Sequence, residues 1–93
     1  VIGGYLTPHF TDDAHEYTIQ NIDEIDAYYF DWEVYNQANT LVFTSGGPTY
    51  GLTSIYLYLP HEGNYIIRVR AWDYSVVNSS EWGTLAFPVY NRN

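Results

Sequence analysis

Paired carboxylates are the first feature of this sequence that could do chemistry. Asp31 and Glu33 lie two positions apart, which places their side chains about 7 Å apart on one face of a strand. Two carboxylates flanking a bond are what glycoside hydrolysis requires. The strand pairing expected below puts Arg68 and Arg70 opposite them on a flat sheet. That pairing favours a structural ion-pair role over catalysis.

Imidazoles near acidic residues suggest a metal site. His9 and His15 flank Asp12 and Asp13, and Glu16 follows His15. A zinc site needs three or four convergent ligands, and this spacing matches no zinc-ligand pattern. The favoured interpretation is a polar loop between the first two strands.

Calcium is the metal that the acidic clusters would suit, because it prefers hard oxygen ligands. The clusters are Asp12 with Asp13, and Asp23 with Glu24 and Asp26. Neither matches the EF-hand loop, and solvated loops have the same composition. Calcium therefore stays a candidate ligand, and no other cofactor is indicated.

Other catalytic motifs are missing from the sequence. There is no Cys, which excludes a thiol nucleophile, a Cys-based zinc site and a disulfide scaffold. There is also no GxSxG, no HExxH and no phosphate-binding Gly loop. The sequence predicts a protein that is not an enzyme.

Charge and composition narrow the class of partner. The net charge is −8, from eleven acids against three Arg, with no Lys. Nucleic acids and anionic membranes need a basic patch, and no apolar run is long enough to span a membrane. Few charges with many Tyr, Asn, Thr and Ser favour an extracellular or cell-surface location. No signal peptide is present, and the first residue is Val, which is typical of a processed chain or an excised domain.

Gly and Pro divide the 93 residues into short β-type runs. We predict one domain, 1–93, with seven strands at 4–9, 16–21, 27–37, 40–45, 53–59, 64–73 and 83–90. Turn signals at this spacing indicate an all-β sandwich.

Alternation with period 2 assigns the strand faces. Phe30, Trp32 and Val34 share one face of the third strand, and Trp32 is the expected core anchor. In the fifth strand Tyr56 and Tyr58 point away from the apolar face.

The clearest family signal lies in residues 59–73. Leu59-Pro60, a Gly63-Asn64 turn, Tyr65 and an alternating strand resemble the E–F corner and F strand of fibronectin type III domains. Ala71-Trp72-Asp73 followed by Asn78-Ser79-Ser80-Glu81-Trp82 resembles the variant in bacterial and archaeal surface proteins. The resemblance implies a seven-stranded antiparallel Ig-like or fibronectin type III-like sandwich, with Tyr65 at the tyrosine-corner position.

The same resemblance implies that the third and sixth strands pair antiparallel. Asp31 and Glu33 then lie across from Arg68 and Arg70. Such opposite-charge pairs contribute about 0.2–1 kcal/mol each, so the four side chains are expected to set strand register.

Outer-face aromatics are the main functional lead, since exposed aromatic rows stack on sugars or bury against protein partners. A structural reading, that Tyr simply suits strands, stays open. The candidate interaction residues are Tyr29, Tyr35, Tyr56, Tyr58, Trp72 and Trp82.

The terminal segments point to self-association. Residues 1–6 and 85–90 are apolar and uncharged, and the chain has no Lys, the residue that often protects exposed strand edges. Strand addition between neighbouring copies would use such edges.

Two hypotheses follow from these features. The first is a non-catalytic structural or adhesion module that assembles into a fibre or surface layer, with other copies of itself as partner. The second is a carbohydrate-binding or spacer module of a larger secreted enzyme or adhesin, with glycans as partner. Asn78-Ser79-Ser80 is a glycosylation sequon that would matter in a surface protein.

Overall fold

The computed structural model describes residues 2–3, 8–20 and 28–91. These residues form strands and no helix, as the all-β prediction requires. The strands in this part of the chain are β1 (Ile2–Gly3), β2 (His9–Phe10), β3 (Ala14–Ile19), β4 (Tyr29–Asn36), β5 (Leu41–Thr44), β6 (Thr49–Tyr50), β7 (Ser54–Tyr58), β8 (Gly63–Trp72) and β9 (Gly83–Tyr90).

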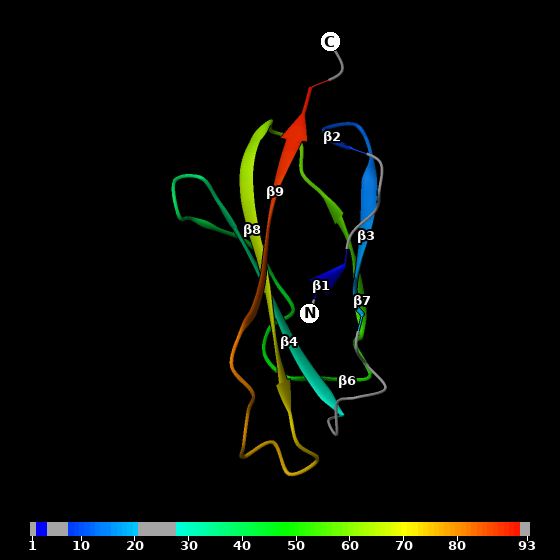
Figure 1. The fold of residues 1–93 in the computed structure, drawn as a ribbon, viewed down its shortest axis with the longest axis vertical. Coiled ribbons are helices and arrows are strands. Elements are labelled where there is room, and N and C mark those ends of the chain that lie inside the picture. The colour runs from blue at the N-terminus through cyan, green and yellow to red at the C-terminus, as the bar shows by residue number, and fades with distance from the viewer. Residues whose placement is uncertain (1, 4–7, 21–27, 92–93) are drawn as a thin grey trace.

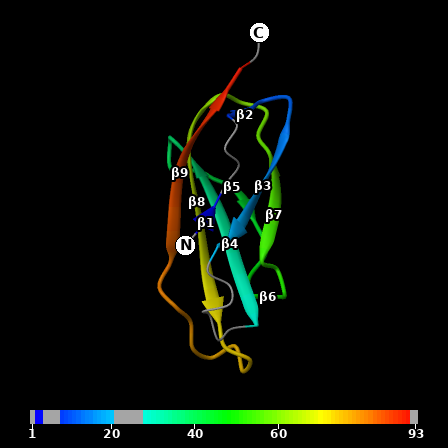
Figure 2. The ribbon, with the colours of Figure 1, turned by 45° about the vertical axis from the view of Figure 1, so that its right-hand side comes forward.

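Two sheets stand beside each other along the long axis (Figures 1 and 2). The smaller has the order β1-β3-β7, and the larger has the order β2-β9-β8-β4-β5, with β6 also paired to β4. The pairings are antiparallel except for β2 with β9, which is parallel. The result is sandwich-like.

The core fills the space between the sheets. Alternate residues of β3, β4, β7, β8 and β9 point inward, which is why period 2 located them. Trp32 is fully buried, and its indole Nε1 donates a 2.8 Å hydrogen bond to the carbonyl of Leu52. The expected core anchor is therefore in place, with its polar atom satisfied.

Seven strands were expected, and the described residues form nine. The expected strand at 4–9 lies mostly outside the described residues. On either side of that gap, β1 joins the smaller sheet and β2 joins the larger one. Both ends of this N-terminal region therefore pair, but in different sheets.

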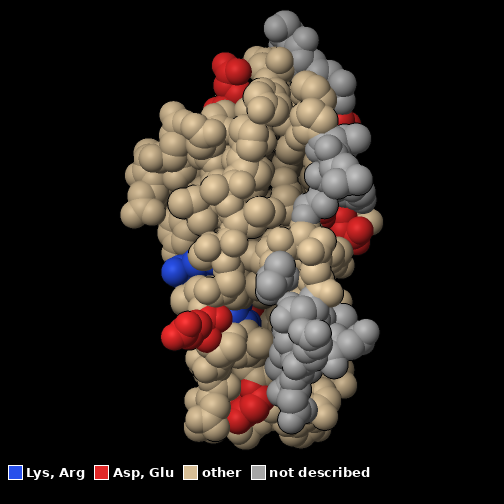
Figure 3. All heavy atoms as spheres, viewed as in Figure 1, with Lys and Arg blue, Asp and Glu red and all other residues tan. Residues whose placement is uncertain are grey.

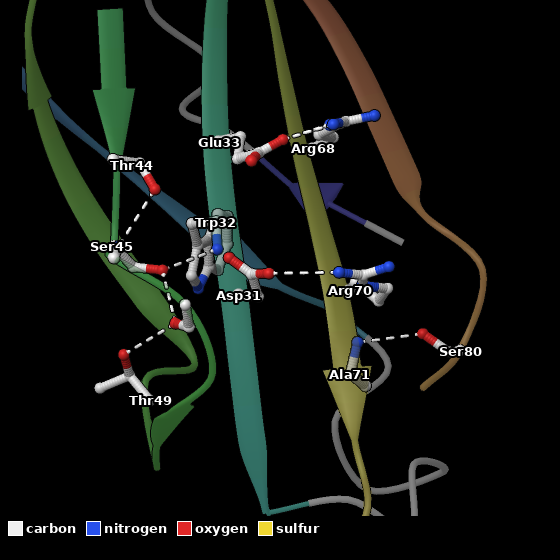
Figure 4. Close-up of polar contacts among 12 residues, drawn as sticks. Asp31, Trp32, Glu33, Thr44, Ser45, Thr49, Arg68, Arg70, Ala71 and Ser80 are labelled. Atoms are coloured by element: carbon white, nitrogen blue, oxygen red, sulfur yellow. Dashed lines mark hydrogen bonds and ion pairs between the residues drawn. The ribbon is translucent and has the colours of Figure 1, made fainter. Parts of the chain in front are cut away.

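The other additional strand, β6, follows a turn rich in glycine. Gly46 and Gly47 have φ values of 83° and 113°, which L-residues with side chains rarely adopt. After these glycines the chain returns to β4, so β5 and β6 pair with different parts of the same strand. Between the two, Ser45 Oγ accepts a 2.9 Å bond from the Trp32 backbone (Figure 4). Sequence alternation could not reveal a two-residue strand made by this return.

A tyrosine near the start of β8 bonds back to the connection that precedes this strand. Tyr65 is buried, and its hydroxyl donates a 2.6 Å hydrogen bond to the carbonyl of His61. This bond ties the β7–β8 connection to the start of β8, at the upper end of the molecule in Figure 1.

Candidate interaction surfaces

Two ion pairs cross the outer face of the larger sheet. The β4–β8 register places Asp31 opposite Arg70 and Glu33 opposite Arg68, the arrangement expected from the sequence. Arg68 Nε donates a 2.8 Å hydrogen bond to Glu33 Oε1, and Arg70 Nη2 lies 3.5 Å from Asp31 Oδ2 (Figure 4). Asp31 is only 7% exposed, so this carboxylate is far less open than a flat outer face suggested.

The Glu33–Arg68 pair favours the charged form of the Glu33 carboxylate. Burial raises the pKa of Glu33, but the hydrogen bonds from Arg68 and Tyr35 outweigh it and bring that pKa below its ordinary value. A carboxylate held in its charged form by a guanidinium is poorly suited to be a general acid.

A ladder of alternating rings and guanidinium groups covers these pairs. Arg68 lies 4.0 Å and Arg70 4.4 Å from the Trp82 ring centroid, so one indole contacts both cations. Arg68 also lies 5.1 Å from Tyr35, and Arg70 lies 4.8 Å from Trp72. We call these five residues the arginine–aromatic ladder. The ring faces of Tyr35, Trp72 and Trp82 are used in cation–π contacts within the chain. This favours a structural role for these three aromatics, which were proposed as interaction residues.

The segment between β8 and β9 is organised by Asp73. Its carboxylate accepts hydrogen bonds from Ser75 Oγ at 2.8 Å, the Val77 amide at 3.1 Å and Asn78 Nδ2 at 3.0 Å. The Asn78 and Ser75 side chains and the Val77 amide lower the pKa of Asp73 to about 2. Val76 has φ 57°, which is unusual for a β-branched residue. The sequon residue Asn78 is thus exposed but already engaged as a donor.

Tyrosines gather beside this segment, at the lower end of the molecule in Figure 1. Tyr28 and Tyr74 meet edge-to-face with centroids 5.3 Å apart, and Tyr29 meets Tyr50 at 5.5 Å. Tyr50 and Tyr74 are 66% and 69% exposed. Of these four, only Tyr29 was expected as an interaction residue. In the sequence, the adjacent Tyr28 and Tyr29 are the signal that could have located this tyrosine cluster.

Two further exposed features lie on strands that border their sheets. Tyr56 and Tyr58 of β7 are 65% and 60% exposed on the outer side of the smaller sheet, where alternation placed them. Leu41 and Val42 of β5 are 45% and 43% exposed. The β5 residues were missed: the sequence indicated apolar, uncharged edges only at the two chain ends.

The histidines depart from their expected place. His9 and His15 are not in a polar loop: both are buried, 3% and 8% exposed, in β2 and β3. Their rings stack with centroids 4.4 Å apart and an angle of 11°, and His9 Nδ1 lies 3.0 Å from Tyr17 Oη. The interpretation was wrong because β2 pairs with β9, which carries His9 between the sheets beside Phe87.

The acidic residues proposed as calcium ligands are not grouped into a site within the described residues. Asp12 and Asp13 lie in the turn between β2 and β3, while Asp23, Glu24 and Asp26 lie outside the described residues. Within residues 2–3, 8–20 and 28–91, no three His, Asp or Glu side chains are grouped as metal ligands. Nor does this part of the chain contain a helix long and apolar enough to cross a bilayer.

Comparisons with known proteins return no match: no family model fits the chain, and no curated protein is similar in sequence.

Proposed function

We propose that this chain is a non-catalytic, extracellular structural or adhesion module that associates with copies of itself through the edge of β5. The observation that carries the proposal is the character of that edge. Leu41-Val42-Phe43-Thr44 has no charge and no proline, and Leu41 and Val42 are 45% and 43% exposed.

An unprotected edge strand is a template for pairing with another chain. Within the described residues β5 pairs with β4 alone, so its other side offers main-chain donors and acceptors. Soluble sandwiches commonly block such an edge with Lys, Pro or a charge, or twist it away with a bulge. β5 has no Lys, Pro or charge, and its register shift leaves Val42 as a bulged residue. Repeated pairing of this kind would build a fibre or a surface layer.

A fibronectin type III-like class is part of the proposal. The supporting observations are the β4–β8 antiparallel register, the Tyr65–His61 corner, and Trp82 leading into β9. Few charged residues and many aromatics support an extracellular location, and the net charge of −8 argues against a nucleic-acid partner.

The test is a matched pair of valine-to-lysine variants measured by light scattering over a range of concentrations. Val42→Lys places a charge on the β5 edge. Val77→Lys makes the same chemical change at a 72% exposed valine in the β8–β9 segment, and leaves the same net charge.

We expect the unmodified chain and Val77→Lys to form concentration-dependent oligomers, and Val42→Lys to weaken association at least about tenfold. A monomeric unmodified chain at every concentration contradicts self-association. Equal weakening by both variants contradicts the β5 edge and indicates a general charge effect.

A second candidate function is that of a carbohydrate-binding or spacer module. The exposed pair Tyr56 and Tyr58 on β7 favours it, because neighbouring rings can stack on sugar faces. Loss of polysaccharide binding in a Tyr56→Ala, Tyr58→Ala double variant would support this candidate, and an unchanged affinity would remove that platform.

A further inference from the structure

A groove lies between the β4–β5 hairpin and the outer face of β8 and β9. Its volume is about 400 Å³, within the range of small-ligand sites. Amide side chains and an apolar floor form it. The lining residues that matter here are Asn36, Gln37, Asn39, Asn64, Ile66 and Ala86.

Side-chain size explains the hollow. On the outer face, Asn64 pairs with Pro88 and Ile66 pairs with Ala86, so compact β9 residues lie beside longer β8 residues. The hairpin forms a wall beside this floor. In Figure 1 the hairpin projects from the upper part of the larger sheet, next to β8 and β9.

Hydrogen bonds hold the wall in position. Asn36 Oδ1 accepts bonds from the Ala38 and Thr40 amides at 3.0 and 2.9 Å, which closes the hairpin turn. Gln37 Oε1 accepts a 3.3 Å hydrogen bond from the main-chain N–H of Asn64, which ties the hairpin to β8. The groove is therefore preformed, and binding would cost little ordering entropy.

The free hydrogen-bonding groups of the groove are neutral. The side-chain amides of Asn39 and Asn64 make no hydrogen bond to other described residues, and each offers both a donor and an acceptor. No charged residue lines the groove. Figure 3 agrees: the surface over the hairpin and the upper parts of β8 and β9 is uncharged, with charged side chains above and below it.

We propose that this groove binds a neutral oligosaccharide. Sugar hydroxyls donate and accept, as amides do, and the C–H faces of a pyranose match a floor made by Ile66, Ala86 and Pro88. An anionic ligand would find no cation in this groove, and the nearby Arg68 is already paired with Glu33. An extended peptide would need unpaired main-chain groups, but β8 is already paired to β4 and β9 on its two sides.

A second hollow extends the site along the outer face. It has a volume of about 340 Å³ and is lined by Tyr35, Asn39, Ile66, Arg68 and Thr84. Asn39 and Ile66 belong to both hollows. Together the two hollows cover more of the outer face than either does alone, so a chain of several sugar units fits better than a single sugar. This inference does not rest on self-association through β5.

The test follows side-chain amide signals by NMR while neutral oligosaccharides are added at millimolar concentration. The probes are cellohexaose, maltohexaose, mannohexaose and chitohexaose, with a blocked neutral peptide of alternating Ala and Thr as the competing class. We expect at least one sugar to shift the signals of Asn39 and Asn64. We expect Asn64→Ala to weaken that binding about tenfold.

Two further variants distinguish binding in the groove from binding elsewhere on the surface. Ala86→Leu fills the floor from an exposed position without removing an amide, and it is expected to abolish binding. Tyr58→Ala removes an exposed ring on the other sheet and is expected to leave binding unchanged. Three outcomes overturn the proposal: no shift with any sugar, shifts with the peptide alone, or binding lost in Tyr58→Ala but kept in Asn64→Ala.

Discussion

The buried His9–His15 pair makes the stability of this protein depend on pH near neutrality. Burial lowers the pKa of His9 below 6.5, and the adjacent His15 lowers it further. The Asp13 and Leu57 main chains and the Asp13 carboxylate raise it by less. The other titratable group against the ring is Tyr17, whose own pKa is raised by burial. His9 Nε2 is buried and makes no hydrogen bond of ordinary geometry among the described residues.

The sign follows from proton linkage. Above pH 6.5 His9 is neutral in both states, and its full contribution to stability is present. As the pH falls below 6.5, the unfolded chain takes up a proton that folded His9 resists. The free energy of unfolding therefore decreases until the pH passes the lowered pKa of the folded state. One such proton gives a slope of at most about 1.4 kcal/mol per pH unit.

The assay is chemical denaturation followed by tryptophan fluorescence from about pH 8 to about pH 5, a range that spans the ordinary His pKa of about 6.5. Changing His9 alone would leave Tyr17 Oη without its partner, so the informative variant is His9→Phe with Tyr17→Phe. Replacing both partners by apolar groups of similar shape is nearly neutral. Tyr17→Phe alone is the control, because it keeps the imidazole.

We expect the unmodified chain and Tyr17→Phe to lose stability on acidification more steeply than the double variant, by up to about 1.4 kcal/mol per pH unit. Equal slopes in all three proteins would refute the reasoning, since His9 would then be as easily protonated folded as unfolded. A double variant that is steeper than the unmodified chain would refute it as well.

Two other substitutions test the contacts that frame the proposed surfaces. Tyr65→Phe should cost about 0.5–1.5 kcal/mol of unfolding free energy, because it removes the 2.6 Å hydrogen bond to the carbonyl of the exposed His61; an unchanged denaturation midpoint would contradict a stabilising role for this bond. Trp82→Ala should cost about 1–2 kcal/mol from two cation–π contacts, with Arg68 and Arg70, and Trp82→Phe should recover part of it; a Phe variant no better than Ala would argue against ring–cation attraction.

Local pattern was enough to predict most strands and their faces. Side chains alternate in any strand, so Trp32 and Val34 had to share a face whatever the sheet order, and both are fully buried. The resemblance to fibronectin type III domains implied the antiparallel pairing of the third and sixth strands, and Asp31 and Glu33 do lie opposite Arg70 and Arg68. The same resemblance placed Tyr65 at a corner position after the Gly63-Asn64 turn, and its hydroxyl does bond back to His61. These features depend on neighbours along one strand or on one strand pair.

The candidate surfaces depended on contacts between segments far apart in the sequence. The groove needs the β4–β5 hairpin to stand beside β8 and β9, and Asn39 and Asn64 have no common motif. Trp82 lies over two arginines because of where the β8–β9 connection returns. The β5 edge became visible only when the sheet order was known.

What the sequence by itself determined is an acidic, all-β chain with its core residues, because alternation acts over short range. Tertiary structure alone decided that His9 is buried against His15, that β1 and β2 join different sheets, and that amides converge on one groove. The physical reason is that burial and convergence are properties of packed neighbours. A polar residue between glycines and acids has no local signal that tells whether another sheet will cover it.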